Sequence, residues 1–272
     1  MKGQVTEPGT VGLPTAVQFA RFFDVVGYDI SLDKLEKSSK LIAVFHSPVE
    51  ADVYVTIVNA GINGDNTLDM LAIFDLCNEI ARLQSNALVA IESTVAVGAC
   101  RQIAERFGFK RLVHCPHRCW SGDSTKYDVV RKRILGALNE ESLMADEEFY
   151  FKANIPLHKV LSLEVAELAK ITENAYRFVE IAFAESLTIT CKKFAISFEE
   201  VKTACNTLKR PEYDYHIQVL DATDGVGGHC LPKDTRYLLS VMRSELLEGA
   251  ILTDKFYKLW QKKLKEEIEN YA

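Results

Sequence analysis

The sequence lacks a long apolar segment, and this absence is the first constraint on what the chain does. No stretch of its 272 residues approaches the ~18 consecutive apolar residues that a membrane-spanning helix needs. Basic residues are also in the minority, because 32 lysines and arginines face 38 aspartates and glutamates and leave a net charge of −6. We expect no nucleic-acid partner, since phosphate backbones require a basic face. The first residues, MKGQ, do not begin a signal peptide, so no secretion is expected either.

Cysteines are present but follow no pattern. Seven are scattered along the chain, an odd number without the spacing of a disulfide framework. Thiols and imidazoles come close together at residues 114–119, HCPHRC, but no second cluster could complete a zinc site. We therefore expect free thiols in a reducing cytoplasm, no metal, and a ligand-lining loop at 114–119.

What the chain does have is an alternation of strand-like and helix-like segments over its first 160 residues. Strands are expected at 4–6, 25–30, 53–58, 87–92, 111–114, 133–137 and 159–163, and helices at 15–23, 68–83 and 101–107. This order predicts an α/β fold with a doubly wound, Rossmann-type parallel sheet. Ligands bind such a sheet at the carboxyl ends of its strands.

The pattern changes after about residue 163. One helical run covers 164–195, and shorter helices are expected at 198–205, 236–247 and 255–271. We predict two domains: residues 1–160 bind a dinucleotide, and residues 161–272 form a helical domain around the long helix. The apolar face of the run 164–195 is longer than so small a domain can cover, which predicts a homodimer packed along it.

The first segment that indicates chemistry is the turn Gly9-Thr10-Val11-Gly12, which stands between a strand and a helix. A pyrophosphate would rest there on the free N–H groups of the helix N-terminus. Asp29 ends the next strand, where an acid hydrogen-bonds a ribose 2′-hydroxyl and repels a 2′-phosphate. These residues predict NAD rather than NADP, although an ordinary strand–helix turn remains the alternative.

Glu7 stands where the dinucleotide fingerprint has its first glycine. A carboxylate beside a pyrophosphate repels it, so we expect weak binding of the cofactor. Glu7→Gly should tighten NAD⁺ affinity about fivefold, or ~1 kcal/mol, if one repulsive contact is removed. Isothermal titration of both proteins measures this effect, and an unchanged or weaker affinity would contradict it. A preference for NADP⁺ would contradict the role of Asp29.

The second segment that indicates chemistry is DGVGGHCLPKD at 224–234. Its glycines allow positive φ and close approach of another molecule. Cys230 follows them as a candidate nucleophile, and Asp234 comes four residues later. Lys170 and Asn174 lie one turn apart in the long helix, where a partly buried lysine can serve in catalysis. The ordinary alternatives are a tight turn with a buried cysteine and a solvated helix face.

Taken in chain order, these segments resemble the nucleotide-sugar dehydrogenase family, which includes UDP-glucose, UDP-N-acetylmannosamine and GDP-mannose dehydrogenases. The matching segments are GTVGLP at 9–14, GYD at 27–29, ESTV at 92–95 with Gly98, residues 166–177, NT at 206–207, and 225–234. The resemblance covers nearly the whole chain, and GVGGHCLPKD is its most specific part. Residues 173–177 and 206–207 are most similar to the UDP-N-acetylhexosamine branch.

The resemblance implies oxidation of a sugar primary alcohol to a uronic acid with two NAD⁺ per turnover. Cys230 would attack the intermediate aldehyde, giving a thiohemiacetal and then a thioester that water hydrolyses. Lys170 and Asn174 would stabilise the oxyanion, and Asp234 with Thr94 would position the water, roles that suit their chemistry. The cofactor would contact Gly9, Thr10, Val11, Gly12, Asp29, Val58 and Thr94.

Some features depart from the family. Besides Glu7, the segment between Asp29 and Ala51 is shorter than usual, and His117 stands where the family has an acid–base glutamate. The chain also stops before the second α/β domain that covers the nucleotide sugar in the family. Two alternatives therefore stay open: a degenerate homologue that binds without turnover, and a dehydrogenase of small 3-hydroxyacids. Cys230 argues against the latter, because oxidation of an alcohol to a ketone needs no thiol.

Overall fold

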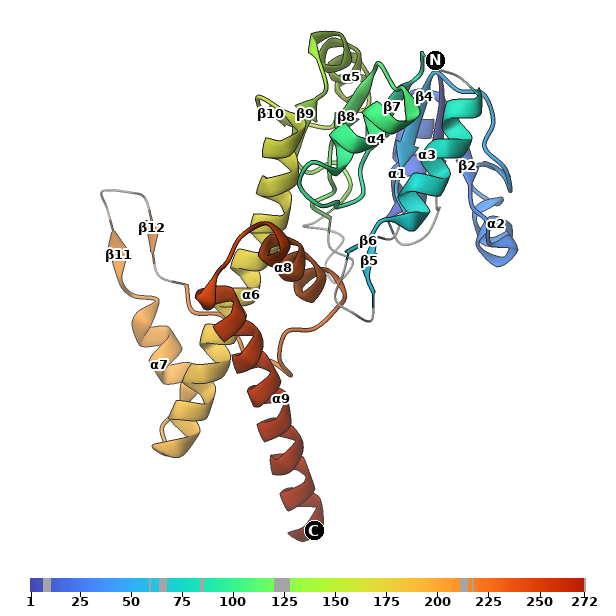
Figure 1. Ribbon diagram of the computed structural model, residues 1–272. Helices are drawn as coiled ribbons and strands as arrows, with labels where there is room; N and C mark the ends of the chain where they lie inside the picture. The colour runs from blue at the N-terminus through green and yellow to red at the C-terminus, as the bar shows by residue number, and fades with distance from the viewer. Residues whose placement is uncertain are drawn as a thin grey trace. The chain divides into compact units, whose positions relative to one another are not determined.

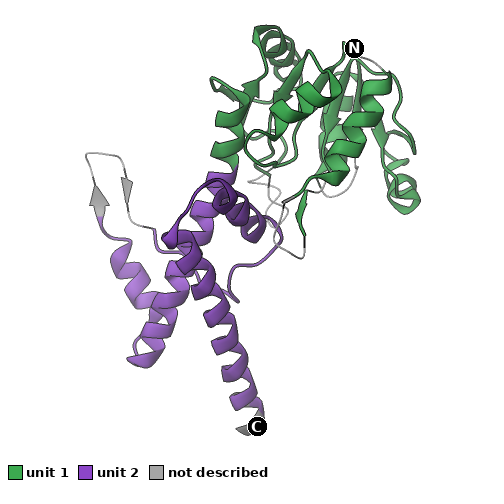
Figure 2. Ribbon diagram, viewed as in Figure 1, with its two compact units in different colours: residues 1–170 green, residues 171–272 purple. Residues whose placement is uncertain are grey.

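The computed structural model describes residues 1–6, 11–58, 60–63, 68–83, 86–119, 128–210, 215–216 and 218–271. Glu7, Gly9 and Thr10 therefore lie outside the described residues. The chain divides into two compact units, residues 1–170 and 171–272 (Figure 2). The helix α6 (Leu163–Lys193) is continuous from the first unit into the second.

The first unit is built on an eight-stranded sheet with the order β10-β9-β8-β7-β4-β1-β2-β3 (Figure 1). Its strands are β1 (Lys2–Thr6), β2 (Asp24–Tyr28), β3 (Ala43–Phe45), β4 (Val53–Thr56), β7 (Leu88–Ile91), β8 (Leu112–His114), β9 (Arg133–Ala137) and β10 (Leu157–Lys159). The six neighbouring strands β8-β7-β4-β1-β2-β3 are all parallel. From β1 the chain adds β2 and β3 on one side, and it then crosses to the other side of β1 to add β4, β7 and β8. This confirms the Rossmann-type fold and puts its ligand-binding switch point at the ends of β1 and β4.

Helices of the first unit pack on the sheet. They are α1 (Gly12–Ala20), α2 (Leu32–Ser38), α3 (Leu71–Leu83), α4 (Ala99–Phe107) and α5 (Glu140–Lys152). Several of them, such as α3 and α4, bury one apolar face. The helix α3 buries residues 73, 76, 77 and 80, the one-face pattern of an amphipathic helix. In contrast, β4 is buried at all four positions, as expected for a parallel strand covered on both sides.

The core on one side of the sheet is dominated by aromatic rings from α1 and α5. The ring centroids of Phe19 and Phe149 are 4.7 Å apart, and Tyr150 meets Phe149 edge-on at 5.2 Å. These rings pack on Val5, Val55 and other buried residues of the sheet. The tilted and edge-to-face arrangements are those that aromatic pairs prefer, so α1 and α5 are fixed to the same layer.

The sheet is not parallel throughout, because β9 pairs antiparallel with β8 and β10 then runs parallel to β9. The sheet is therefore mostly parallel, as predicted, with β9 and β10 running opposite to the other six strands. A parallel pairing would need a crossover, usually a helix, and the described residues between β8 and β9 contain none. A Cβ on Gly136 would lie 2.4 Å from the carbonyl oxygen of Ser162 and 2.9 Å from Ala166, so β9 passes directly against the start of α6.

The strand expected at 159–163 is misplaced, since β10 spans Leu157–Lys159 and α6 begins at Leu163. Leu161, in the middle of the expected strand, is almost fully exposed. A short pair, β5 (Gly61–Ile62) and β6 (Leu68–Asp69), completes the strands described in this unit.

The second unit is helical, as predicted, and contains the rest of α6 with α7 (Phe198–Cys205), α8 (Cys230–Val241) and α9 (Glu245–Tyr271). The strands β11 (Lys209–Arg210) and β12 (Tyr215–His216) pair antiparallel. The helix expected at 236–247 is wrong, because the extended backbone of Met242 separates α8 from α9. Among the described helices, not one combines the length and apolar character that crossing a bilayer requires.

Candidate active site

Hydrogen bonds tie together the segments that leave β1, β4 and β7 at the switch point of the sheet. Thr6 Oγ1 accepts from the N–H of Ile57 at 2.8 Å. Ser93 Oγ accepts from the N–H of Val58 at 2.8 Å and donates to the Val58 carbonyl at 2.8 Å. The structure thus fixes Val58 beside the loop that carries Thr94, two residues predicted to contact the cofactor. Sequence reasoning missed Ser93, whose signal was a hydroxyl directly after a buried strand.

The N-terminus of α1 has the features of an anion site. Its N-cap residue, Val11, provides no side-chain cap, and no acidic residue occurs in the first turn after Gly12. The N–H groups at this end are therefore left for a ligand, and the helix dipole favours negative charge there. Thr15 does not compete for them, since its hydroxyl donates to the Val11 carbonyl at 2.8 Å.

Asp29 lies at the carboxyl end of β2, as a ribose-binding acid should, but its carboxylate is already engaged. Oδ1 accepts from the N–H of Ser31 at 2.8 Å, and Oδ2 lies 3.3 Å from Lys34 Nζ. The side chain is only 1% exposed. A ribose hydroxyl can reach this carboxylate only if Lys34 moves aside, so the role of Asp29 stays a prediction.

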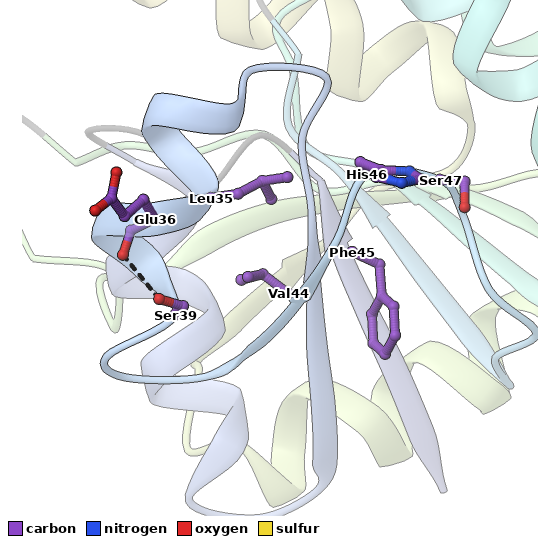
Figure 3. A pocket seen from close by; sticks show the side chains of 7 residues that line it. All are labelled: Leu35, Glu36, Ser39, Val44, Phe45, His46 and Ser47. Carbon is purple, nitrogen blue, oxygen red and sulfur yellow. Dashed lines mark hydrogen bonds between the residues drawn. The ribbon is translucent and has the colours of Figure 1, made fainter.

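A hollow of about 310 Å³ lies between α2 and β3, at the edge of the sheet (Figure 3). Its lining residues are Leu35, Glu36, Ser39, Val44, Phe45, His46 and Ser47. The Ser39 hydroxyl donates to the Glu36 carbonyl at 2.8 Å, and most of the lining surface is apolar. The hollow lies beyond β2 in the strand order, away from the switch point, so we do not place the chemistry there.

A buried ionic cluster is centred on Glu92, which directly follows β7. One oxygen of its carboxylate lies 2.8 Å from Arg133 Nη1 and contacts His117 Nε2, and the other accepts from the Tyr150 hydroxyl. Burial alone would raise the pKa of Glu92, but the Arg133 guanidinium, the charge that His117 takes up in acid, and the hydrogen bonds from His117 and Tyr150 lower it to about 2. Glu92 is therefore a fixed anion at neutral pH.

His117 belongs to this cluster, and whether it replaces the family's glutamate stays a prediction. Burial and the nearby Arg133 guanidinium lower its pKa, so the ring is neutral at pH 7. Its Nε2 faces Glu92 and lies 3.3 Å from Thr15 Oγ1, which places the ring proton on Nε2 as a donor to the carboxylate. We conclude that His117 connects the β8 loop to Glu92 and to α1.

The first turns of α6 are anchored to α4, and this anchoring positions Lys170. The carboxylate of Glu167 accepts from the N–H groups of Gly98 and Cys100 at 2.6 and 2.8 Å, which caps the N-terminus of α4. Lys170 follows one turn later and is 8% exposed. Burial first, and then the charge of Lys170, lower the pKa of His114 to about 3, so Lys170 lies near the carboxyl end of β8.

Cys230 is the first residue of α8 and is exposed. The turn before it has positive φ at Thr223, Gly225 and Gly228, and the glycines there make this path possible. The N-terminal end of a helix favours negative charge, which suits a thiolate nucleophile. Of the other six cysteines, four are buried and two are half-buried.

Asp234 and Asn174, both predicted as catalytic, lie together in the second unit. Asn174 Nδ2 donates to Asp234 Oδ2 at 2.5 Å, and Lys233 Nζ donates to the other carboxylate oxygen. Asp234 is completely buried one helical turn after Cys230, and Lys233 also lies over the Tyr237 ring at 4.3 Å. Sequence reasoning missed Lys233, although a lysine beside a buried aspartate is its natural partner.

Two segments of the chain match the models of one known protein family. Residues 42–154 match the NAD binding domain of the UDP-glucose/GDP-mannose dehydrogenase family, and residues 164–255 match its central domain. The chain belongs to this family. The family match confirms the resemblance drawn from the sequence, and it confirms NAD as the cofactor. The turn at 9–12 and Asp29 lie outside the matched segments, whereas Thr94, Lys170, Asn174, Cys230 and Asp234 lie within them.

Two curated relatives that are similar to this chain are both UDP-N-acetyl-D-mannosamine dehydrogenases. A UDP-N-acetyl-D-mannosamine dehydrogenase of Pyrococcus horikoshii is 29% identical over 270 residues, which cover 85% of this chain and 62% of the relative. The enzyme of that name from Escherichia coli K12 is 27% identical over 271 residues, covering 85% and 63%. The chain thus spans less than two thirds of the length of these curated relatives.

The fold is also similar to that of a solved structure of a protein with this activity in its name. The UDP-D-ManNAc dehydrogenase structure from Pyrococcus horikoshii aligns with a TM-score of 0.87 at 26% identity, over 100% of this chain and 72% of that chain.

Proposed function

We propose that this protein oxidises the primary alcohol of a nucleotide sugar, a UDP-N-acetylhexosamine or UDP-glucose, to the uronic acid with NAD⁺. The observation that carries the proposal is the arrangement in the second unit. An exposed cysteine opens α8, and Asp234 lies one turn later, held by Asn174. A thiol is needed only where an aldehyde must be carried on to an acid, which favours this reaction over oxidation of a simple 3-hydroxyacid.

NAD⁺, when bound, accepts a hydride in each of the two oxidations. The turn at 9–12 and the N-terminus of α1 would hold its pyrophosphate, and Asp29, Val58 and Thr94 would contact the rest of the cofactor. We assign these roles to residues 1–160. Residues 161–272 carry the catalytic cysteine and the dimer contacts in this proposal.

The Cys230 sulfur adds to the aldehyde carbon left by the first oxidation, forming a C–S bond, and the new oxyanion takes up a proton. Loss of that proton and of a second hydride turns this thiohemiacetal into a thioester. Water then adds to the thioester carbon, the C–S bond breaks, and the carboxylate leaves while the thiol is restored. Each alcohol thus consumes two NAD⁺ and one water.

Lys170 and Asn174 stabilise the oxyanions in these steps, because their N–H groups donate where negative charge develops. Lys170 is one α6 turn before Asn174, so the two side chains share a helix face. Asp234, together with Thr94, orients the attacking water and takes its proton.

A degenerate homologue that binds without turnover remains the second candidate, and one observation favours it. His117 occupies the family's glutamate position but is bound to Glu92, so the acid–base role of that position has no replacement there. Such a protein would keep the fold and a ligand site while lacking one proton-transfer group.

An assay with NAD⁺ and a panel of UDP-sugars distinguishes these functions. UDP-N-acetylmannosamine, UDP-N-acetylglucosamine and UDP-glucose are each incubated with the protein, and NADH and product mass are followed. Two NADH per uronic acid support the proposal. Binding of a UDP-sugar by calorimetry without NADH supports the degenerate homologue, and one NADH per ketone from a small hydroxyacid supports the remaining alternative.

We also propose that the protein is a cytoplasmic homodimer packed along residues 164–195. Apolar side chains stay exposed on this part of α6, including Tyr176 and Phe183 at 59% and 62%. Static light scattering should therefore give a dimer mass at micromolar concentration. Phe183→Glu should shift the mass toward the monomer, and Lys263→Glu, at an exposed position of α9 outside this segment, is the matched control. A monomer mass for the unaltered chain would contradict the proposal.

A further inference from the structure

The turn that leads into Cys230 is held by side chains of α9. Asp254 Oδ1 accepts from the N–H of Val226 at 2.8 Å, and Lys258 Nζ donates to the Val226 carbonyl at 2.8 Å. Tyr257 donates its hydroxyl to the carbonyl of Thr223 at 3.0 Å. The backbone of the turn thus has partners on both sides of Gly225, all from one face of one helix.

Gly225 makes this contact possible. Its φ is +95°, and a Cβ there would lie 2.7 Å from Lys258 Cε and 3.0 Å from Asp254 Oδ1. Lys258 Nζ also lies 2.9 Å from the second oxygen of Asp254, so the two side chains form a pair against which the turn packs. We call Val226, Asp254 and Lys258 the clamp.

Glu185 of α6 carries a carboxyl group on which the charges of Asp254 and Lys258 act, and among the described residues it forms no ion pair. The side chain is fully buried, and no described residue lies at a normal hydrogen-bond distance from its oxygens, but the Asp254 carboxyl and the N–H of Val226 are close enough to act on its charge. Burial, and then the Asp254 carboxylate, raise the pKa of Glu185 to about 7, while Lys258 opposes the rise. The ionisable groups that face it are Asp254, Lys258 and Tyr257, all on α9.

We propose that Asp254 is a positioning residue for Cys230, which it serves by fixing Val226, and that a proton on Glu185 keeps the clamp closed. The proton is bound below the raised pKa of Glu185 and is lost above it. Ionised Glu185 then repels Asp254 in a buried environment, which weakens the bond to Val226 and loosens the turn before α8. The functional meaning of this clamp rests on the proposed role of Cys230, but the clamp itself concerns only the turn.

Hydrogen exchange of the peptide that contains Val226, measured by mass spectrometry and corrected for intrinsic exchange, tests the clamp directly. Asp254→Asn should exchange Val226 roughly tenfold faster at pH 6, because a neutral amide oxygen accepts the N–H more weakly than a carboxylate does. In the unaltered chain, protection should fall between pH 6 and pH 8. Glu185→Gln, which cannot ionise, should keep the same protection at both values.

Controls separate the clamp from general destabilisation. Asp221→Asn alters an exposed carboxylate shortly before the same turn, which pairs with Lys202 at 2.6 Å, and should leave the exchange of Val226 unchanged. If Asp254→Asn does not fold, Lys258→Met removes the bond to the Val226 carbonyl and should also accelerate exchange. Equal loss of protection with pH in Glu185→Gln and the unaltered chain would overturn the proposal.

The pH dependence of kcat and KM tests whether the clamp acts on catalysis. The unaltered chain should show a kcat that falls above pH 7, and Glu185→Gln should lose this fall with little change in KM for the nucleotide sugar. If exchange responds as described but the chain has no activity, the proposed function fails and the clamp stands. If Cys230→Ala abolishes acid formation while exchange in Glu185→Gln still depends on pH, the clamp fails and the proposed function stands.

Discussion

Cys230→Ala should abolish formation of the uronic acid, with a loss on the order of 10³-fold or more, because no other group can carry the acyl intermediate. Cys230 is exposed at the start of α8, so its replacement removes little packing and should leave the fold intact. Cys230→Ser should instead accumulate a slowly hydrolysed ester, since an alkoxide is a poorer leaving group than a thiolate. Intact-protein mass spectrometry during turnover detects that adduct.

The exposure of Cys230 at the start of α8 also predicts that its thiol is alkylated faster than the other thiols. Limited alkylation with iodoacetamide at pH 7 should modify Cys230 before the other cysteines, and NAD⁺ should protect it if the cofactor binds over it. Cys205→Ala, at a half-buried cysteine of the same unit, is the control and should not change the leading modification. Labelling of Cys115 or Cys119 ahead of an unmodified Cys230 would favour the degenerate homologue.

Glu92→Gln should destabilise the protein by about 3–5 kcal/mol, because it leaves the fully buried Arg133 without its counter-charge. Urea unfolding monitored by circular dichroism measures the loss. Glu148→Gln, which alters an exposed carboxylate paired with Lys152, should change the unfolding midpoint little. Combining Glu92→Gln with Arg133→Met should recover part of the loss, since the unpaired charge is then removed. A Glu92→Gln protein as stable as its parent would mean that Arg133 finds another partner.

The pKa of Glu92 also sets the pH dependence of stability. Its folded-state pKa of about 2 is below the ordinary value of 4.5, so the unfolded chain binds a proton first as the pH falls. The stabilisation from Glu92 is fully present above about pH 4.5 and is lost as the pH falls toward 2. The Glu92→Gln protein should therefore lose less stability than its parent over this interval.

The central strands and the long helix could be predicted because each carries an unmistakable pattern. β4 and β7 are short apolar runs, and α6 keeps helical spacing over 31 residues. The helix α5 escaped prediction because its apolar residues do not gather on one face. Its start was still marked in the sequence, since Asn139 caps it by accepting from the N–H of Ser142 at 2.9 Å, with two glutamates in the first turn.

Part of the candidate site could be predicted from spacing, and part could not. Cys230 and Asp234 were both singled out from the sequence, four residues apart, but the helix expected from residue 236 did not include them. Because α8 begins at Cys230, one helical turn relates the two residues. The pairing of Asn174 with Asp234, and of His117 with Glu92, joins positions far apart in the chain. Such contacts depend on how elements pack, which periodicity does not encode.

The close passage of β9 against α6 limits how this protein can change by mutation. At Gly136 any side chain would collide with backbone of the residue before the long helix, and backbone cannot turn away as a flexible side chain can. A saturation library should accept almost nothing at this codon, yet accept many residues at Gly249, where a Cβ would meet no atom within 4 Å. A glycine with no part in catalysis would thus be as intolerant as the nucleophile, so a ranking by mutational intolerance would not by itself find the active site.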